Sequence, residues 1–401
     1  MKDTSLYPCI RFSEYQNEWQ KSQLQNSVIL ISGQHLSPDQ YDTKSNENPY
    51  FTGPSDFTND VGKLRKWSLV ESKLAECGDI LITVKGSGVG EMMMLGLPKV
   101  AIGRQLMAIR SGDNVNNNFI HFRLQKNKKL FEALASGNLI PGLSRPDILQ
   151  TKIYLPCKKE QQKIADFLSG VDKKISLLEE KHTLLEQYKK GVMQKLFSQE
   201  IRFKDKNGND FPDWEKGTLG DLSNKVSNKN KDESVTAVLT NSAKSGIVNQ
   251  TDYFKKDIAN ENNLGGYSIV EKDDFVYNPR ISVLAPVGPI KRNHVGQGVM
   301  SPLYTVFRFK DDNIFDYLEL YFETTQWHRY MNSIANFGAR HDRMNITMGD
   351  FFNLPIPIPS QGEMVKIVGF IQALNKKVNA VSKQIEHTQT FKKGLLQQMF
   401  V

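Results

Sequence analysis

Hydrophobic residues recur at alternating spacings of four and three in two stretches of this chain. This is the heptad pattern of a helix that packs along a single stripe, and each stripe lasts about five heptads. The first stripe consists of Ile164, Leu168, Val171, Ile175, Leu178, His182, Leu185, Lys189, Val192 and Leu196. The second consists of Ile367, Ile371, Leu374, Val378, Val381, Ile385, Thr388, Lys392, Leu395 and Met399. The pattern predicts two long amphipathic helices.

The two predicted helices are copies of one segment, because the second stripe repeats the first 203 positions later in the same register. The similarity is strongest where YKKGVMQKLF at 188–197 matches FKKGLLQQMF at 391–400. It fades upstream through SRPDILQTKIYLP and TMGDFFNLPIPIP. It recurs at the other edge, where IRF followed by Trp19 resembles IRF followed by Trp214. We therefore predict two copies of one unit of about 200 residues.

A helix of about 38 residues is about 57 Å long, which is more than one domain needs to cover its core. Because the two stripes share their register, we expect the helices to pair with each other. An antiparallel pair would act as a spacer with a domain at each end and make the repeat a pseudo-twofold. The alternative is that each helix only covers its own domain. Ser360 and Glu363 have the spacing of a capping box, which places the start of the second helix there.

Polar residues interrupt both stripes at His182, Lys189, Thr388 and Lys392. Single polar residues at such positions can fix the register of a helix pair. They can equally be solvent-facing ends of the stripe. For the two lysines we favour the second interpretation, because the aromatic residues beside them can cover the seam.

Between the repeated edges the sequences diverge but follow one plan of short strands and glycine-containing turns. The strand patterns are GDILITVKGSG and KVAIGRQLMAIR in the first copy, and DDFVYNPRISV and GVMSPLYTVFRF in the second. A helical pattern follows in each, HFRLQKNKKLFEALASG and FDYLELYFETTQWHRYMNSIANFG. We predict two α+β domains.

The chain carries a net charge of +8 and a pI of about 9.1, which suits a protein that binds polyanions but is also common in other proteins. Its three cysteines have no paired or CxxC spacing, so neither a disulfide framework nor a zinc site is predicted. The N-terminus lacks the order of a signal peptide, and no apolar run approaches the roughly 18 residues of a membrane span. We expect a soluble cytoplasmic protein.

Several motifs together resemble the specificity subunit of bacterial type I restriction-modification systems. They are the alternation of a variable domain with a repeated helix, the motif WEK at 214–216 leading to LGDL, the segment IPIP at 356–359, and the KKG-to-Phe helix ends. The resemblance covers essentially the whole chain. One departure is that WQK at 19–21 lacks the following Gly-Asp-Leu, which puts the first strand of the first domain in doubt.

The resemblance implies two target-recognition domains at 1–155 and 201–358, and two spacer helices at 156–200 and 359–401. Each domain would read one half of a split, asymmetric site in double-stranded DNA. The helices would set the gap between the halves and dock two methyltransferase subunits, through which restriction subunits would join. The chain itself would catalyse nothing and bind no cofactor or metal; S-adenosylmethionine, ATP and Mg²⁺ would belong to its partners.

The helix positions that would serve pairing and subunit docking are Ile164, Leu168, Val171, Ile175, Leu178, Leu185, Ile367, Ile371, Leu374, Val378, Val381 and Ile385. Half-sites read from one face of B-DNA lie roughly 34 Å apart, a gap that a rod of about 57 Å can span. Because the two domains differ in sequence, the site need not be palindromic.

Enzyme motifs are weak in this sequence. Asn48-Pro49-Tyr50-Phe51 has one proline too few for the catalytic corner of an adenine methyltransferase. GSGVG at 86–90 follows a strand, but a glutamate and a methionine run follow it in place of a clean helix start. A plain hairpin turn is the favoured interpretation; the alternative is a tight turn that holds its backbone amides and Lys85 near a DNA phosphate. Two alternatives stay open: a stand-alone DNA-binding decoy, and a self-contained methyltransferase with a degenerate motif.

The clearest DNA-binding candidate is the segment GARHDRMN at 338–345. An arginine can pair bidentately with guanine or grip a phosphate, and a Gly-Ala start lets the loop approach a groove. A solvated basic turn is the alternative. The candidate DNA-binding residues are Lys85, Ser87, Arg104 and Arg145 in the first domain, and Arg280, Lys291, Arg292, His294, Arg340, His341 and Arg343 in the second.

Overall fold

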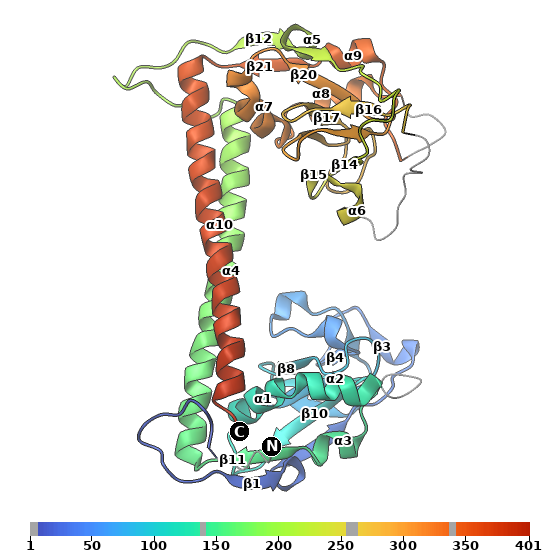
Figure 1. The fold of residues 1–401 in the computed structure, drawn as a ribbon. Coiled ribbons are helices and arrows are strands. Elements are labelled where there is room, and N and C mark those ends of the chain that lie inside the picture. Colours follow the sequence, from blue (N-terminus) through green and yellow to red (C-terminus); the bar gives the residue numbers. More distant parts are fainter. Residues whose placement is uncertain (1–6, 137–141, 254–263, 337–341) are drawn as a thin grey trace. The chain divides into compact units, whose positions relative to one another are not determined.

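The structure is a computed structural model that describes residues 7–136, 142–253, 264–336 and 342–401. The chain forms two compact units, one of residues 1–180 with 381–401 and one of residues 181–380. Each unit holds one α+β domain, the N-terminal part of one long helix and the C-terminal part of the other (Figure 1). The long helices are α4 (Lys158–Phe197) and α10 (Gln361–Gln398), so both predicted helices are present.

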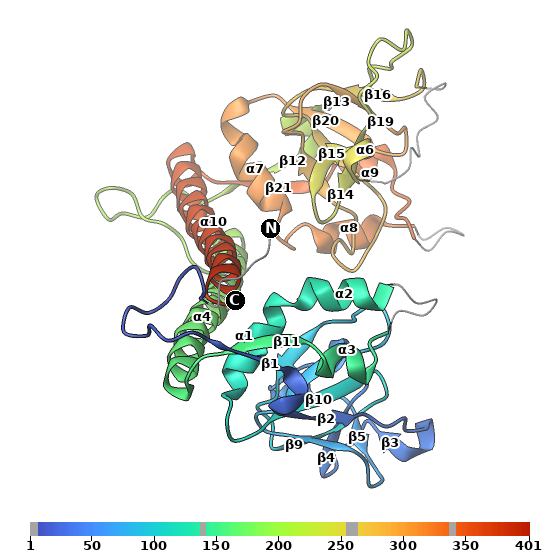
Figure 2. The ribbon, with the colours of Figure 1, turned by 60° about the horizontal axis from the view of Figure 1, so that its bottom comes forward.

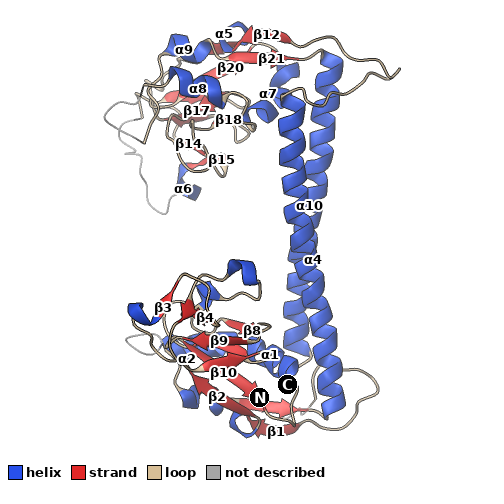
Figure 3. Ribbon diagram, turned by 180° about the vertical axis from the view of Figure 1, so that it is seen from behind, coloured by secondary structure: helices blue, strands red, loops and turns tan. Residues whose placement is uncertain are grey.

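The two long helices run antiparallel (Figure 3). In the first unit Lys392 Nζ lies 2.6 Å from Asp172 Oδ1, and Gln389 donates to Glu179 at 3.4 Å. Residue numbers therefore rise along α4 where they fall along α10. In the second unit Lys189 Nζ donates to Asn375 Oδ1 at 3.0 Å. This pairing confirms the predicted antiparallel coiled coil.

The contacts of the lysines correct one interpretation of the sequence. We favoured solvent-facing positions for Lys189 and Lys392, but both ammonium groups reach the partner helix. The partners, Asp172 and Asn375, stand at equivalent places in the two repeats. The lysine side chains are only 19% and 17% exposed, which agrees with a buried alkyl stem whose charged end reaches a polar group on the other helix.

Each domain is built on a four-stranded antiparallel sheet with the same strand order. In the first domain the order is β2 (Val28–Ser32), β10 (Leu106–Ser111), β7 (Ile80–Thr83) and β8 (Met92–Met94). In the second it is β13 (Ser223–Lys225), β20 (Thr305–Phe309), β17 (Phe275–Tyr277) and β18 (Ile290–Arg292). The shared order shows that the domains are copies of one fold despite their divergent sequences.

An ion pair also recurs in the two sheets. The carboxylate of Asp79, in the turn before β7, accepts two hydrogen bonds from Arg110 at 2.9 and 2.8 Å. Asp274, before β17, accepts two from Arg308 at 2.6 and 3.0 Å. Both aspartates are buried, and bidentate pairing with arginine offsets the cost of removing their charge from water.

The domains differ in their second layer of strands. The first domain has a five-stranded sheet of β3 (Tyr41–Asp42), β5 (Trp67–Ser68), β4 (Asn48–Phe51), β9 (Lys99–Ile102) and β6 (Leu74–Glu76). The second has two strand pairs, β14 (Leu239–Ser242) with β15 (Gly246–Asn249) and β16 (Ser268–Val270) with β19 (Gly298–Met300).

Short helices complete each domain, as the sequence predicts. The first domain has α1 (Asn117–Lys126), α2 (Lys128–Ser136) and α3 (Arg145–Leu149). The second has α5 (Leu219–Leu222), α6 (Gln250–Tyr253), α7 (Phe315–Phe322), α8 (His328–Ile334) and α9 (Met348–Phe352). In the second unit α7 packs between the sheet and the helix pair (Figure 2).

A two-stranded ribbon carries the chain from each domain into its long helix. β1 (Gln20–Gln23) pairs with β11 (Lys152–Leu155), and β12 (Glu215–Thr218) pairs with β21 (Pro355–Ile358). The first domain therefore forms this strand although it lacks the Gly-Asp-Leu motif. A 3₁₀ turn at Leu24–Asn26 stands where the second domain has α5.

The arginine of each repeated Ile-Arg-Phe motif and the tryptophan that follows it bind one glutamate near the start of a long helix. We call each such set of three residues a helix clamp. Arg202 donates to both carboxylate oxygens of buried Glu363 at 3.1 and 2.7 Å, and Trp214 Nε1 donates to the same group at 2.9 Å. In the first unit Arg11 donates to Glu160 at 2.7 and 2.8 Å, and Trp19 Nε1 at 3.3 Å.

This clamp corrects the predicted capping box. α10 does begin directly after Ser360, but the Glu363 carboxylate is engaged by Arg202 and Trp214. The Ser360 hydroxyl has no hydrogen-bond partner among the described residues. The same Ser-x-x-Glu spacing therefore serves a tertiary contact.

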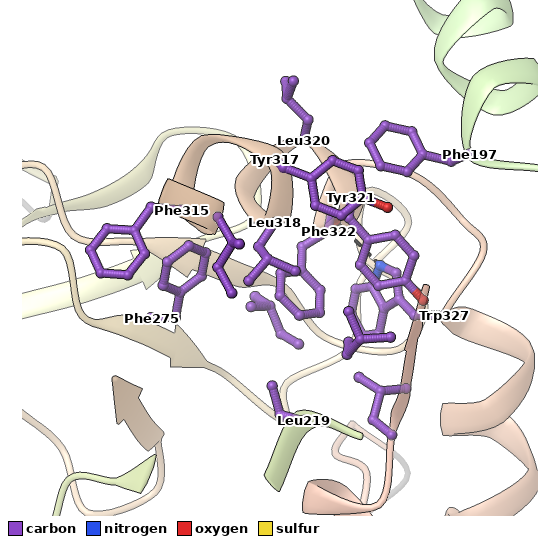
Figure 4. Close-up of a cluster of buried hydrophobic side chains, with 14 of the residues drawn as sticks. Phe197, Leu219, Phe275, Phe315, Tyr317, Leu318, Leu320, Tyr321, Phe322 and Trp327 are labelled. Atoms are coloured by element: carbon purple, nitrogen blue, oxygen red, sulfur yellow. Dashed lines mark hydrogen bonds between the residues drawn. The ribbon is translucent and has the colours of Figure 1, made fainter. Parts of the chain in front are cut away.

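The aromatic residue at each repeated helix end anchors a domain core. In the second unit Phe197 at the end of α4 packs against Tyr317 and Tyr321 of α7, with ring centroids 5.3 and 5.8 Å apart (Figure 4). In the first unit Phe400 packs on Phe119, with ring centroids 5.1 Å apart. The KKG-to-Phe motif thus recurs because each copy completes the core of the unit that holds it.

The predicted domain boundaries stay a prediction. The long helices begin and end within three residues of the predicted spacer segments, 156–200 and 359–401. The compact units, however, divide both helices between them, since unit 1 takes the start of α4 and the end of α10.

Candidate nucleic-acid interface

One end of the central sheet gathers basic residues in the first domain. Lys85 lies two residues after the end of β7 and forms a backbone bridge with Gly142; beside this bridge the Leu143 amide donates to the Val84 carbonyl at 2.8 Å. The adjoining turn, which contains Ser87, joins β7 to β8, and Gly86 and Gly90 adopt φ of +90° and +85° there. Lys85 and Ser87 are exposed. GSGVG is therefore a hairpin turn, as favoured from the sequence.

Two more predicted residues lie at the same end. Arg104 is exposed in the turn between β9 and β10, beside Gln105, whose carbonyl accepts from the Val84 amide at 2.8 Å. Arg145 opens α3, and its Nη1 donates to Ser32 Oγ at 2.8 Å where β2 ends. The strand register brings the ends of β2 and β7 next to the start of β10. Lys85, Arg104 and Arg145 thus share one end of the sheet.

The second domain places two predicted arginines at the equivalent position. Arg280 follows β17 and forms a backbone bridge with Arg343, while the Met344 amide donates to the Pro279 carbonyl at 3.0 Å. This is the arrangement of Lys85 with the segment before α3. The Arg280 and Arg343 guanidinium groups lie 3.8 and 3.9 Å from the same Asp342 carboxylate, and their side chains are 67% and 30% exposed.

A cavity of about 790 Å³ opens beside this arginine pair. The β14–β15 hairpin, the segment 278–284 and the turn 301–304 line it, together with Arg343. Asn241 lies at its base, where its amide nitrogen donates to the carbonyls of Val276 and Pro289 at 2.7 and 3.2 Å. The Asn241 Oδ1 atom is buried without a partner among the described residues.

The structure does not bring Lys291, Arg292 and His294 to this end. The register of β18 pairs Arg292 with Phe275, at the opposite end of β17 from Arg280. Arg292 is bound to Asp273 and Asp316 at 2.7 and 2.6 Å, and these hydrogen bonds raise the pKa of its guanidinium group against the opposing effect of burial. His294 contacts Glu319 at 2.7 Å.

Arg340 and His341 lie outside the described residues. At the end of the predicted loop, Asn345 forms a backbone bridge with Asn336.

The predicted pairing positions of the long helices are buried or half-buried. Those that are buried are Ile164, Leu168, Ile367, Ile371, Leu374, Val378 and Val381; those that are half-buried are Val171, Ile175, Leu178, Leu185 and Ile385. Ile164 and Leu168 belong to the hydrophobic core of the first unit, and Ile367, Ile371 and Leu374 to that of the second. The docking of another subunit on these positions stays a prediction.

Apolar side chains outside the predicted stripe remain exposed on the helices. In the first unit Phe167 and Phe391 line a groove of about 580 Å³ together with Lys174 and the stripe residue Val171. In the second unit Tyr188, the counterpart of Phe391, and Leu184, the counterpart of His387 in the groove, are exposed, whereas Phe370, the counterpart of Phe167, is half-buried. From the sequence, Tyr188 and Phe391 were expected to cover the seam beside the two lysines, but both side chains are more than half exposed.

A polar cavity of about 430 Å³ in the first domain was not predicted from the sequence; Lys63, Arg65 and Lys66 line it with Asp56. Lys66 Nζ lies 3.3 Å from Asp56 Oδ2. Hydrogen bonds from Thr52, together with Lys66, lower the pKa of the Asp56 carboxyl against the effect of its burial. The Lys-x-Arg-Lys run in the sequence was the available signal.

The segment that partly matches a methyltransferase motif is a buried strand. Asn48-Pro49-Tyr50-Phe51 forms strand β4, with Tyr50 and Phe51 buried.

Within the described ranges, no group of three or more His, Cys, Asp and Glu residues is arranged to hold a metal ion. None of the described helices is both long and apolar enough to cross a membrane.

The fold is thus a duplicated α+β domain in which each copy leads into a long helix. A family model described as the type I restriction modification DNA specificity domain matches residues 16–187 and again 212–388. The chain therefore belongs to the family of type I restriction-modification specificity subunits, as the resemblance predicted.

Two relatives from Methanocaldococcus jannaschii carry the same description. The putative type I restriction enzyme MjaX specificity subunit is 28% identical over 194 residues, which is 48% of this chain and 45% of the relative. The type I restriction enzyme MjaVIII specificity subunit is 28% identical over 142 residues, 34% of this chain and 33% of the relative. The matched regions span less than half the length of these relatives.

Solved structures share the fold along nearly the whole chain. The S subunit of a type I restriction-modification system from M. genitalium has a TM-score of 0.53 at 18% identity and covers 98% of this chain and 99% of its own. A chain from a structure on complex assembly and conformational transition of the type I system has a TM-score of 0.57 at 15% identity, covering 95% and 97%. These likenesses establish the fold.

Proposed function

We propose that this chain recognises DNA for a type I restriction-modification complex, with each domain reading one half of a bipartite, asymmetric site. The observation that carries the proposal is the equivalent placement of Lys85 and Arg280. Two domains of one fold hold a cation at the same end of the sheet, in loops that differ in length and sequence. Cations attract the DNA backbone, while different loops favour different bases.

The chain acts in this proposal without catalysing a reaction. Two methyltransferase subunits dock on the exposed apolar side chains of the helix pair, one near Phe167 and Phe391 and one near Leu184 and Tyr188. Restriction subunits join through them. S-adenosylmethionine, ATP and Mg²⁺ are bound by those partners, and the complex works in the cytoplasm.

The first experiment mixes the purified chain with its cognate methyltransferase subunit, S-adenosylmethionine and genomic DNA. Methylation mapped by sequencing should fall on one bipartite motif. The chain alone should transfer no methyl group; turnover without the partner would instead support a degenerate methyltransferase. Binding to DNA with no methylation in the presence of the partner would support a stand-alone decoy.

Domain assignment is tested with matched variants at equivalent positions. Lys85→Ala should weaken discrimination only in the half-site read by the first domain, and Arg280→Ala only in the other. If a residue contacts phosphate alone, all sequences should weaken alike and the slope of log affinity against log salt should fall by about one.

The role of the helices as a spacer is tested by a paired insertion. Seven residues added after Leu178 in α4 and after Glu386 in α10 keep the heptad register and lengthen both helices by about 10 Å. The gap in the methylated motif should grow by two to three base pairs, at about 3.4 Å each. The same seven residues inserted after Asn207, in an exposed loop, should leave the gap unchanged.

A further inference from the structure

The loop after β17 ends in a tight turn with two aliphatic side chains at its tip. The Ser282 amide donates to the Ala285 carbonyl at 3.0 Å, and the Ala285 amide donates back to the Ser282 carbonyl at 3.1 Å. Only Val283 and Leu284 lie between these two residues. Their side chains are 98% and 68% exposed, and no other large hydrophobic residue of the described chain is as exposed as Val283.

Such a turn has no structural need for aliphatic residues. Neither Val283 nor Leu284 has the positive φ for which hairpin turns select Asn, Gly or Asp, so the backbone of this turn accepts many side chains and requires no aliphatic one. Neither side chain contributes to a core, because both project into solvent. A pair of adjacent exposed aliphatic residues is therefore best explained by a contact made with a partner.

The surroundings of the turn favour a polyanionic partner. Arg280 stands at the base of the loop, paired along the backbone with Arg343. Lys244, exposed at the tip of the β14–β15 hairpin, lines the same cavity as Leu284. Asp342 is the acidic residue bound to the two arginines, at 3.8 and 3.9 Å. Three cations around an aliphatic tip suit a ligand that presents phosphates beside an apolar group.

Among the described residues, the equivalent loop of the first domain lacks this aliphatic tip. The Thr83 amide donates to the Glu91 carbonyl as the Asn278 amide donates to the Pro289 carbonyl, which aligns the two loops. Eight residues separate Arg280 from Pro289, but only five separate Lys85 from Glu91. The shorter loop carries Gly-Ser-Gly in place of the aliphatic pair, so the tip distinguishes what the two domains can contact.

We propose that the Val283–Leu284 turn enters the major groove of DNA and contacts a thymine methyl group in the half-site read by the second domain. The major groove admits a two-stranded ribbon, and the thymine C5-methyl is the apolar group that base pairs present there. Arg280, Arg343 and Lys244 hold the flanking phosphates or base edges. This assignment rests on the proposed function, because it presumes that the second domain reads DNA.

The test uses the complex of the full chain with its methyltransferase subunit and a duplex that carries the methylated motif. Each thymine of the second half-site is replaced in turn by deoxyuridine, which removes only the methyl group. At one thymine the affinity should fall about fourfold, since burial of one such group contributes about 0.8 kcal/mol and 1.4 kcal/mol is tenfold.

A double variant, Val283→Ser with Leu284→Ser, should bind the thymine duplex more weakly by at least the same factor. It should also be indifferent to the deoxyuridine replacement. Its melting temperature should match that of the parent chain, since both residues are exposed. The matched control is Ile29→Ser, an aliphatic residue 64% exposed on β2 of the first domain, which should leave affinity unchanged.

Three results would overturn the inference. If the double variant stays sensitive to deoxyuridine, other residues contact the methyl group. The second result is that the double variant binds weakly although no deoxyuridine replacement changes the affinity of the parent chain. If the fluorescence of 2-aminopurine placed in the half-site also rises when the parent chain binds, the tip is a wedge that unstacks bases. The third result is that neither the deoxyuridine replacements nor the double variant changes affinity while the complex still methylates a bipartite motif; this would refute the thymine contact but not the proposed function. Absence of bipartite methylation by the parent complex would refute the proposed function itself.

Discussion

Lys392 and Asp172 form an ion pair across the helix pair of the first unit, with 2.6 Å between Nζ and Oδ1. At the equivalent place in the second unit, Lys189 donates to Asn375 at 3.0 Å, so the repeat keeps the contact but replaces a carboxylate by an amide. A lysine at a heptad position that requires a polar partner on the other helix specifies register at some cost in stability.

Asn375→Asp should therefore convert the second contact into an ion pair like the first. Because Lys189 and its partner are only partly buried, we expect a gain of up to about 1 kcal/mol at low salt, declining as salt is added. Urea denaturation at two salt concentrations measures it. Asp172→Asn is the reciprocal control and should lower stability by a similar amount; an Asn375→Asp gain that does not respond to salt would contradict the ion-pair explanation.

Arg202 is expected to be the most sensitive residue of the helix clamp. Arg202→Ala leaves the buried Glu363 carboxylate without its cation and should cost about 3 kcal/mol in the free energy of unfolding. Arg202→Lys keeps the charge but loses the two-pronged contact and should recover only part of that loss. Adding Glu363→Gln to Arg202→Ala should restore most of the lost free energy of unfolding. If the losses of the two single variants simply add in the double variant, the contact between Arg202 and Glu363 contributes little to stability.

The duplicated domains and the two long helices could be predicted from the sequence, because local periodicity and an internal repeat specify them. The heptad stripes specify two long helices, and the matched Trp19 and Trp214 mark equivalent domain edges. The partners of Lys189 and Lys392 could not be predicted, because Asp172 and Asn375 lie beside the stripe on another helix. Nor could the role of Glu363, since its spacing from Ser360 fits a cap and only the distant Arg202 decides otherwise.

The candidate interface was predictable only in part, for a physical reason. Arg280 and Arg292 are both basic residues near turns, and nothing local distinguishes them. The pairing register of β17 and β18 places them at opposite ends of a strand, and acidic residues on α7 neutralise Arg292. Which surface cations stay available to DNA therefore depends on contacts between distant segments.

His121 should make the first unit sensitive to mild acid. Burial, together with the nearby Lys392 ammonium group, lowers the pKa of this histidine from 6.5 to about 4. The imidazole of His121 stays neutral in the folded chain at a pH where it is already protonated in the unfolded chain. Protonation as the pH falls therefore favours the unfolded chain. Stability should be full above about pH 6.5 and decline toward pH 4, with a loss of about 2 kcal/mol at pH 5.

Urea denaturation of the parent chain and of His121→Gln at pH 7 and pH 5 isolates this contribution, because other titrating groups act on both proteins. The parent chain should lose about 2 kcal/mol more than the variant on acidification. Equal losses in the two proteins would show that His121 titrates normally in the folded chain.

A fragment of residues 1 to about 205 provides the last prediction. It keeps the first domain and all of α4, but it lacks the segment 381–401 that completes the first unit, including Phe400 packed on Phe119. The exposed stripe from Ile164 to Leu196 favours burial at roughly 25 cal/mol per Å² of apolar surface, so the fragment should not stay monomeric.

A second copy of the fragment can supply what is missing, since each lost group has a counterpart 203 positions earlier. Phe197 of one copy would take the place of Phe400 in the other, and Lys189 would take the place of Lys392 opposite Asp172. Both ends of the dimer would then carry the ion pair in place of the Lys189–Asn375 contact. We therefore expect an antiparallel homodimer that, with the methyltransferase subunit, modifies a palindrome of the first half-site. Lys189→Glu should break the dimer and adding Asp172→Lys should restore it in sedimentation equilibrium; a monomer of the unaltered fragment at micromolar concentration would refute this pairing.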